Sequence, residues 1–452
     1  MDASSRLITP GFVDAHCHGE SFVLRFITAG HASSVWPALV PLRRALETLL
    51  DPAMARQVTE LYSTAGIAHL SAGTTCVGEY LLPFGGDGMT AALDGLGRSG
   101  IRHAAVLQTW EQIGALQARL PGDVRCAVSL GTEDQFTVYS LENLLRAARE
   151  LQCPVAAHVG EHRRDVEAVR RNFRKPPLTV LREFGALTAA TQLMHCNHLG
   201  AADLAAVREI SGTIALCASA AAAKRTGYPL LMRLASHDVR LCLGTDWGSP
   251  GILQEMKFLR RLPQFVPGIR SFSPLELLRM ATINGAHALG WSEQTGSLEI
   301  GKKADCVMFS LDDMRLPALG GRSSTEELAA ALVDYMEPGA VTDVMVDGTF
   351  RIRNGQPAFI DVHEVRRSVR SLQEKFLAGS DRTGTPEKSA PLFPSGEERY
   401  IRGGHDAAPP SLAEPDRQAN LLPPAPPPQE EPRVKLPELS RTVKKVFGED
   451  EL

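Results

Sequence analysis

Residues 10–18 read Pro-Gly-Phe-Val-Asp-Ala-His-Cys-His, and the organisation of the whole chain follows from this stretch. Its first two residues mark a turn, and the apolar pair that comes next predicts a buried strand. Because alternate side chains of a strand share a face, His16 and His18 should lie together, with Cys17 on the other face. Two imidazoles on one rigid strand make half of a divalent metal site. The alternative is two unrelated polar residues at a strand end, and the rest of the chain has to decide between the two.

The composition is that of an ordinary globular protein. The chain has 452 residues, 44% hydrophobic and 22% charged, with a net charge of -4. This is enough material for a large core. No basic block occurs in the first 370 residues, so neither nucleic acid nor an anionic membrane is expected as a partner. No apolar run reaches the roughly 18 to 20 residues of a membrane helix, and the start lacks a signal-peptide pattern.

The cysteines indicate a reducing compartment. None has Cys-x-x-Cys spacing, and most stand in apolar, strand-like runs; the eight are Cys17, Cys76, Cys126, Cys153, Cys196, Cys217, Cys242 and Cys306. This pattern is typical of buried, reduced thiols. We therefore expect a cytoplasmic protein.

Strand-like and helical patterns alternate from residue 10 to residue 246. About eight apolar runs have strand character, and most are followed by a helical pattern, which predicts a parallel sheet covered on both faces. Eight such units predict an α/β fold, a (β/α)8 TIM-like barrel, whose reactive groups stand at the carboxyl ends of the strands. Five metal-binding or ionisable residues fall at such ends: His16, His18, His158, His195 and Asp246. Each is a weak indication alone, and their shared placement is the strong one.

Four of these residues suit one zinc ion. Zinc favours a nitrogen-rich set with one carboxylate and an open position for water, which His16, His18, His158 and Asp246 supply. Such an ion lowers the pKa of bound water to near 7. No lysine ends the fourth strand at 128–131, where a carbamylated lysine could bridge two metals, so we expect one metal.

Two more residues could handle protons. Glu161 stands three residues after His158, where a carboxylate could take a proton from the metal-bound water and pass it to a ring nitrogen or leaving group. Asp246 could both bind the metal and hydrogen-bond the water, and His195 could orient the attacking hydroxide or polarise the substrate. A structural role for His195 and a surface position for Glu161 are the alternatives. Further candidates, of which the two histidines are expected outside the immediate ligand set, are His162, His198 and Glu79.

Beyond the barrel the pattern changes twice. A Ser-Pro cap at 273–274 predicts a helix toward Leu289, followed by short strands at 306–309, 341–346 and 348–353 and a helix at 362–377. From residue 379 prolines crowd together, which predicts a disordered C-terminal tail. Helical spacing returns at 437–448, and this segment either docks on a protein partner or the barrel or remains a frayed tail.

The expected domains follow these changes in composition. They are a short segment (1–9), the barrel (10–295), C-terminal strands and a helix (296–378), a disordered proline-rich linker (379–432) and a short amphipathic helix (433–452).

The chain resembles the amidohydrolase superfamily, in its single-metal chlorohydrolase and aminohydrolase branch. The matching stretches run in family order and lie at 10–18, 71–77, 158–161, 195–199, 243–246, 281–286 and 296–305. The resemblance implies a TIM-like barrel with an added β-sandwich, in which 1–9 is the remnant of an N-terminal sandwich, 10–295 is a metal-dependent hydrolase barrel and 296–378 supplies the C-terminal sandwich strands and helix. It implies one zinc ion, or sometimes Fe²⁺, at the four residues named above, with Glu161 and His195 as the proton-handling and orienting pair. Members include deaminases of guanine, 8-oxoguanine, cytosine, and methylthioadenosine or S-adenosylhomocysteine, and hydrolases of chlorinated triazines.

The chain also departs from that family. Only nine residues precede Pro10, where members usually carry a longer segment that builds half of the sandwich. We therefore expect an incomplete flanking β-sandwich with an open edge, which a second subunit of a homo-oligomer could cover. The substrate-reading loops differ too: 130–134 lacks a Pro-His pair, 218–223 is rich in alanine where a Ser-Asn motif is common, and Trp247 replaces a small residue.

Together these observations predict a metal-dependent hydrolase of a small molecule. The first expectation is a hydrolytic deaminase of an amino-substituted nitrogen heterocycle, of purine, pyrimidine or triazine type, that releases ammonia. Hydrolysis of another C–N or a C–Cl bond is the near alternative. A largely non-catalytic interaction subunit, recruited through its tail, is the alternative of a different class.

Overall fold

The protein is described by a computed structural model that covers residues 5–117, 125–233, 239–312 and 323–378, with the single residues 316 and 319. The predicted linker at 379–432 and helix at 437–448 lie outside the described residues. Both therefore stay predictions.

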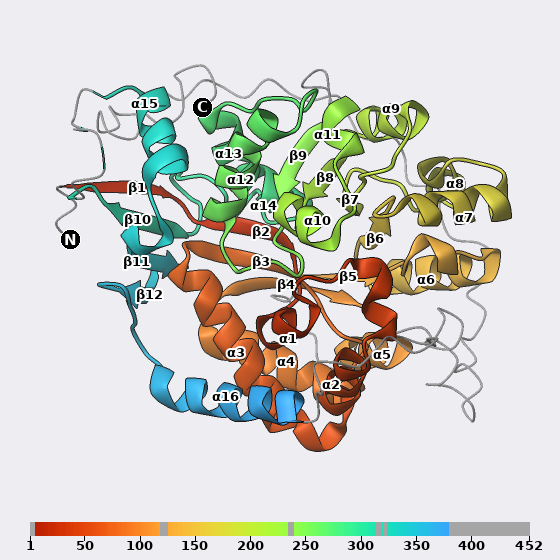
Figure 1. Cartoon of the computed structure of the whole chain (residues 1–452), viewed down its shortest axis with the longest axis horizontal. Helices are drawn as coiled ribbons and strands as arrows, with labels where there is room; N and C mark the ends of the chain where they lie inside the picture. The colour runs from red at the N-terminus through yellow and green to blue at the C-terminus, as the bar shows by residue number, and fades with distance from the viewer. Residues whose placement is uncertain are drawn as a thin grey trace, which may run out of the picture.

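Eight parallel strands form one sheet in chain order and build the barrel (Figure 1). They are β2 (Phe12–Cys17), β3 (Thr74–Tyr80), β4 (Arg102–Leu107), β5 (Arg125–Ser129), β6 (Val155–Val159), β7 (Gln192–His195), β8 (Thr213–Leu216) and β9 (Arg240–Leu243). A parallel bridge between Cys17 and Asp246 brings the first strand back to the end of the last. The predicted (β/α)8 barrel is confirmed.

Helices connect the strands and cover the outside of the barrel. They are α1 (Ser21–Thr28), α2 (Val40–Leu50), α3 (Ala55–Ser71), α4 (Gly86–Ser99), α5 (Trp110–Gln117), α6 (Val138–Glu150), α7 (Arg163–Phe173), α8 (Pro177–Glu183), α9 (Ala201–Glu209), α10 (Ala218–Lys224), α11 (Pro229–Arg233) and α12 (Ile252–Phe265). A short 3₁₀ helix, η1 (Ser33–Ala38), follows α1. Side-chain caps fix several starts: Thr137 accepts a hydrogen bond from the Ser140 amide at the start of α6.

Each barrel strand contributes one buried side chain to a cluster in the barrel interior. This inner cluster consists of Ala15, Tyr80, Val106, Ala127, Ala156, Met194, Ala215 and Cys242. Four of the eight are alanine, which leaves a narrow interior that one layer of side chains can fill. The layer forms a floor, above which the polar side chains of the strand ends collect.

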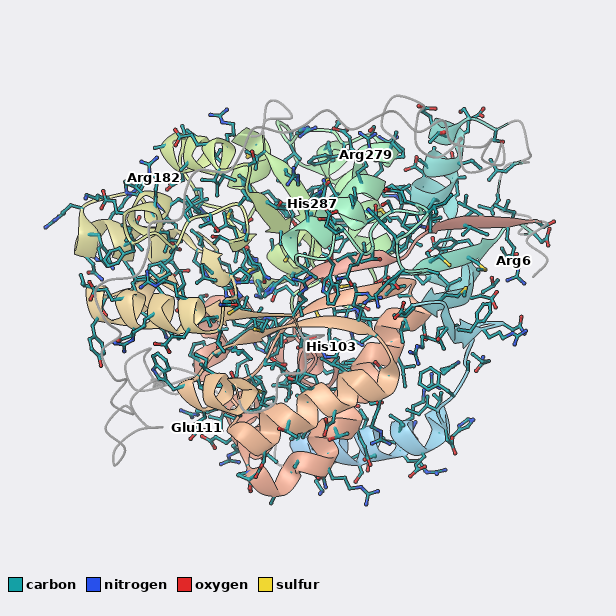
Figure 2. All side chains as sticks on the ribbon, turned by 180° about the vertical axis from the view of Figure 1, so that it is seen from behind. Arg6, His103, Glu111, Arg182, Arg279 and His287 are labelled. Carbon is teal, nitrogen blue, oxygen red and sulfur yellow. The ribbon has the colours of Figure 1, made fainter. Side chains whose placement is uncertain are left out.

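A second, antiparallel sheet flanks the barrel in the order β1-β10-β11-β12-β13. Its strands are β1 (Arg6–Pro10), β10 (Cys306–Ser310), β11 (Val341–Val346), β12 (Thr349–Arg353) and β13 (Gln356–Pro357). The edge strand β1 pairs with β10, Arg6 facing Ser310, and Figure 2 shows Arg6 at the outer end of this sheet. Among the described residues β1 and β13 are the two edge strands of this sheet, and the incomplete β-sandwich stays a prediction.

A buried ion pair joins the two sheets. Arg102, at the start of β4, donates from Nε and Nη2 to the carboxylate of Asp305 at 2.7 and 2.9 Å. Asp305 directly precedes β10, and Thr295 Oγ1 and the Asp347 amide also donate to it. The barrel and the flanking sheet are therefore fixed to each other by a fully hydrogen-bonded carboxylate.

The C-terminal helices differ in part from the prediction. The single helix expected from residue 273 toward Leu289 was wrong, because Thr282 (φ -129°, ψ -96°) separates α13 (Pro274–Ala281) from α14 (Ile283–Ala288). The sequence pattern did not predict α15 (Thr325–Ala330), which continues into a π turn, Ala331–Tyr335. The last described helix, α16 (Val362–Ala378), crosses α3 beneath the barrel (Figure 1). Within the described ranges, no helix has both the length and the apolar character needed to cross a bilayer.

Candidate active site

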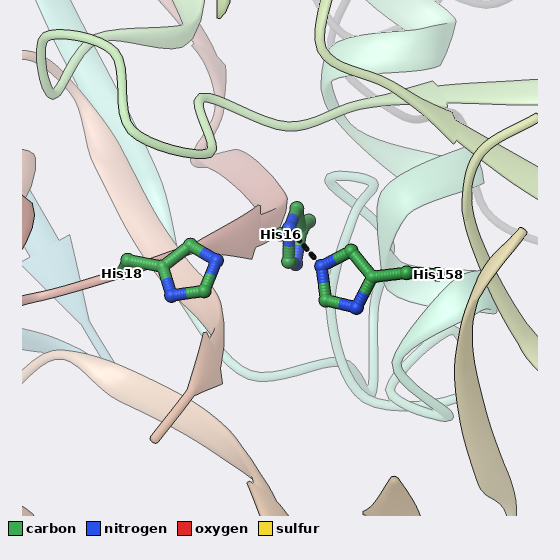
Figure 3. Close-up of side chains that lie close together, drawn as sticks. All are labelled: His16, His18 and His158. Carbon is green, nitrogen blue, oxygen red and sulfur yellow. Dashed lines mark hydrogen bonds between the residues drawn. The ribbon is translucent and has the colours of Figure 1, made fainter. Parts of the chain in front are cut away.

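Three imidazoles converge above the floor of the barrel, as Figure 3 shows for His16, His18 and His158. The Nε2 atoms of His16 and His158 lie 3.3 Å apart. One ligand atom from each of the three residues lies within 4.8 Å of the others, although they come from strands β2 and β6 on different sides of the barrel. His16 and His18 therefore lie close together, as predicted from their spacing in the strand.

Asp246, in the loop after β9, lies close to two of these imidazoles. Its Oδ1 atom lies 3.5 Å from His18 Nε2 and 3.7 Å from His16 Nε2. His195, at the end of β7, reaches the same place and forms a second compact group with His16 and Asp246. The backbones of His195 (φ 64°) and Asp246 (φ 51°) are left-handed, a conformation that non-glycine residues adopt at a cost and that is concentrated at functional sites.

The electrostatic setting keeps two imidazoles neutral. Burial, and then the neighbouring imidazoles, hold the pKa of His16 and of His158 well below the usual range, so each has a lone pair to offer. Burial alone would lower the pKa of His18, but the hydrogen bond with Glu20 raises it overall. Asp246 Oδ1 has no hydrogen-bond partner among the described residues, although it is buried.

These donors fit a divalent transition metal. Two neutral imidazole nitrogens that face each other at 3.3 Å cannot satisfy one another if both carry lone pairs, and a cation between them would accept both. Three imidazoles with one carboxylate oxygen are the donor types and number that zinc prefers, whereas calcium and magnesium prefer all-oxygen sites. His16, His18, His158 and Asp246 could therefore hold one such ion.

Glu161 lies beside the cluster with its carboxylate between two cationic or polar partners. Its Oε1 accepts from Lys224 Nζ at 2.9 Å, and its Oε2 lies 3.9 Å from His195 Nε2. Burial alone would raise the pKa of Glu161, but Lys224 and His195 hold it well below the usual range. Glu161 is thus an ionised, largely buried carboxylate with 13% of its side chain exposed, in contact with Lys224 at the edge of the cluster.

Lys224 is the site residue that the sequence did not reveal. It closes α10, is 8% exposed, and places Nζ 2.5 Å from Asp246 Oδ2 as well as against Glu161. Trp36 of η1 covers it, with Nζ 5.5 Å from the ring centroid. The only indication in the sequence was a charged residue at the end of the alanine-rich run 218–223, which by periodicity alone belongs on the surface.

The three further candidates do not join the cluster. Glu79 accepts from the Gly19 amide at 2.6 Å and from Cys17 Sγ at 3.3 Å, on the far side of β2. His162 contacts Ser33 and Asp165 (2.8 and 3.1 Å), and His198 contacts the carbonyl oxygen of Thr226. The two histidines are therefore outside the ligand group, as expected.

Comparisons with known proteins place the chain in a family. The model of the Amidohydrolase family matches residues 7–351. A 5-methylthioadenosine/S-adenosylhomocysteine deaminase of Syntrophomonas wolfei is 26% identical over an alignment of 403 positions, which covers 83% of this chain and 88% of that protein.

Solved structures share the fold. An adenosine deaminase from Xanthomonas campestris with bound zinc superimposes with a TM-score of 0.72 at 21% identity, covering 83% of this chain and 87% of that one. An atrazine chlorohydrolase from Arthrobacter aurescens complexed with zinc superimposes with a TM-score of 0.68 at 17% identity, covering 82% and 88%. Since the family model spans well over half of the sequence and the barrel carries the polar cluster at its strand ends, this chain belongs to the amidohydrolase family.

Proposed function

We propose that the chain is a zinc-dependent hydrolytic deaminase of an amino-substituted nitrogen heterocycle. The observation that carries the proposal is the position of Glu161, an ionised and largely buried carboxylate whose Oε2 atom lies 3.9 Å from His195 Nε2 at the edge of the ligand group. A proton carrier and a set of metal ligands at the same barrel end are what hydrolysis at a ring carbon requires. The deaminase relatives support the choice of an amine as leaving group.

In this proposal His16, His18, His158 and Asp246 hold the ion. When bound, a zinc ion would act as a Lewis acid and make hydroxide available near neutral pH. Fe²⁺ could take the same set of donors.

The residues of the chain then handle the protons. Glu161 Oε2 takes one proton from the attacking water and delivers it to the ring nitrogen. It then takes the remaining proton of the new hydroxyl group and delivers it to the departing amine, so that a carbonyl group remains on the ring. A C–O bond forms, the C–N bond breaks, and ammonia leaves. His195 Nε2, buried and without a hydrogen-bond partner among the described residues, holds the oxygen of the attacking water in line with the ring carbon.

Metal content tests the first half of the proposal. Elemental mass spectrometry of the purified protein should find about one zinc or iron per chain, and His16→Ala should lose it. His287→Ala, which removes an exposed histidine of α14 (labelled in Figure 2), should keep it. Circular dichroism of both variants separates loss of the ligand from loss of the fold.

Ammonia release from amino-purines, amino-pyrimidines and amino-triazines tests the second half. A wild-type protein that binds no metal even after purification with added zinc would refute the proposal and would favour the non-catalytic interaction subunit. A metal-loaded protein that releases chloride from chlorinated rings, but no ammonia, would point to the C–Cl alternative.

A further inference from the structure

A cavity of about 430 Å³ lies beside the metal-ligand cluster. Residues of α1, η1, α10 and the loop after β9 line it, and it reaches the surface where Gly30 and Arg225 are exposed. A cavity of this size suits part of a small ligand.

The cavity and the cluster share a wall. Lys224 lines the cavity and at the same time contacts Glu161 and Asp246. Trp247 follows Asp246 in the chain, and its ring centroid lies 6.0 Å from that of His18 and 5.0 Å from that of Trp36. One small molecule could therefore place its ring at the cluster and a covalently attached substituent in the cavity.

The lining is cationic and aromatic. Three of its residues are Arg25, Lys224 and Arg225, and none of its residues is a carboxylate. Lys224 is balanced by Glu161 and Asp246, so the two arginines supply the excess positive charge.

Neither arginine has a carboxylate partner within the described parts of the chain. Arg25 is half-buried against Phe22 and Phe26, and its Nη1 atom is buried without a hydrogen-bond partner there. Arg225 donates to the carbonyl oxygen of Gly30 at 3.1 Å and is otherwise exposed. The buried Nη1 atom of Arg25 does not face the cavity, so an anionic ligand would supply acceptors to the other N–H groups of the two guanidiniums, which line the cavity without a carboxylate partner.

We propose that this cavity, the cationic pocket (Arg25, Trp36, Lys224, Arg225 and Trp247), binds an anionic substituent, a carboxylate or a phosphate, of the heterocyclic substrate. Guanidinium groups recognise both anions by paired N–H donors, and the tryptophans cover the linking atoms. The inference rests on the proposed function, because it names the substrate class of that site. The preferred substrate is then an anionic amino-heterocycle rather than a neutral one.

Matched substrate pairs test the pocket with the zinc-loaded full chain. Ammonia release is compared for adenosine and adenosine 5′-monophosphate, for cytosine and cytosine-5-carboxylate, and for pterin and pterin-6-carboxylate. We expect kcat/KM to be at least tenfold higher for the anionic member of a pair than for the neutral member. A preference in the adenosine pair would identify a phosphate as the bound anion, and a preference in one of the other two pairs would identify a carboxylate.

Variants assign the preference to the pocket. Arg25→Gln and Arg225→Gln should each raise KM for the anionic member and lower the ratio of kcat/KM for the anionic member to that for the neutral member about tenfold or more. Arg225→Lys should restore part of the affinity. Arg98→Gln, which removes an exposed cation of α4, is the control and should change neither member.

Binding measured directly tests the cationic pocket independently of the deaminase activity. Calorimetry measures the binding of the same six compounds to the zinc-loaded protein. Ammonia release without any preference for the anionic members, or arginine variants that weaken both members equally, overturns the pocket and leaves the deaminase. Arginine-dependent binding of anions without ammonia release overturns the deaminase and leaves an anion pocket. The absence of both results overturns both proposals.

Discussion

Glu20 accepts a hydrogen bond from His18: the Nδ1 atom of the imidazole lies 3.3 Å from Glu20 Oε1. The hydroxyl of Tyr62, on α3, donates to the other oxygen of Glu20 at 3.0 Å. These two hydrogen bonds place the ring proton of His18 on Nδ1. The Nε2 atom then offers its lone pair toward Asp246 and the cluster. The Glu20 carboxylate thus orients a ligand candidate that lies two residues before it in the sequence.

Glu20→Gln should weaken zinc binding about 10- to 100-fold, because the imidazole loses the charged acceptor that orients it. Tyr62→Phe should have a smaller effect of the same sign. Competition with a chromogenic chelator measures the dissociation constant, and Glu47→Gln, on the exposed side of α2, is the control. Equal affinity in wild type and Glu20→Gln would show that His18 needs no such support.

Glu161→Gln should lower kcat for ammonia release by about 10² to 10⁴ while zinc stays bound, because the proposal makes Glu161 a proton carrier and not a ligand. Steady-state kinetics and elemental mass spectrometry on the same preparation check both parts. Glu167→Gln, which removes an exposed carboxylate of α7 paired with Arg163, should leave both values unchanged. Loss of zinc from the Glu161→Gln variant would show that Glu161 is a metal ligand.

Glu255, on α12, should make the free energy of unfolding fall as pH rises through the weakly acidic range. Burial raises its pKa from 4.5 to about 7, against the hydrogen bonds from Ser219, and the charges of Asp14 and Asp246 add to the rise. Between these pKa values the unfolded chain releases the proton more readily than the native one, so the native state loses stability with rising pH.

Glu255→Gln removes this loss. Relative to wild type, the variant should gain up to about 3 kcal/mol between pH 4.5 and pH 7, with no further gain above that range. Denaturant unfolding at several pH values, with the same metal content in both proteins, gives the difference. The nearby phenol of Tyr228 stays protonated throughout this range, and burial raises its pKa further, from 10 to about 12. A constant difference across pH would contradict the assignment.

Asp305→Ala should destabilise the protein by about 3 to 5 kcal/mol, because it leaves the buried guanidinium of Arg102 without its bidentate partner. The matched control is Asp347→Asn, which removes the charge of the exposed pair with Lys303 but keeps a residue that tolerates the left-handed backbone there (φ 51°), and it should cost no more than about 1 kcal/mol. Urea unfolding measures both. Similar losses in the two variants would mean that the Arg102–Asp305 pair does not join barrel and sheet as described.

Much of the site could be predicted because it follows from local rules. The period of two in a strand puts His16 and His18 on one face, and the parallel order of eight strands puts His158, His195 and Asp246 at the same end. None of this requires knowledge of a specific side-chain contact. The same rules failed at Thr282, where a helical pattern continues through a residue whose backbone leaves the helix.

The sequence by itself determined the barrel, the order of its strands and the ligand candidates at their ends, because hydrophobic periodicity and strand order are properties of the chain. Only the tertiary structure decided that Lys224 lies between Glu161 and Asp246, that Glu20 orients His18, and that Trp36 and Trp247 bound a cationic pocket. Periodicity tells which face of an element a residue occupies. It does not tell which side chain from a distant element meets it there, because that depends on how the loops of the barrel end pack together.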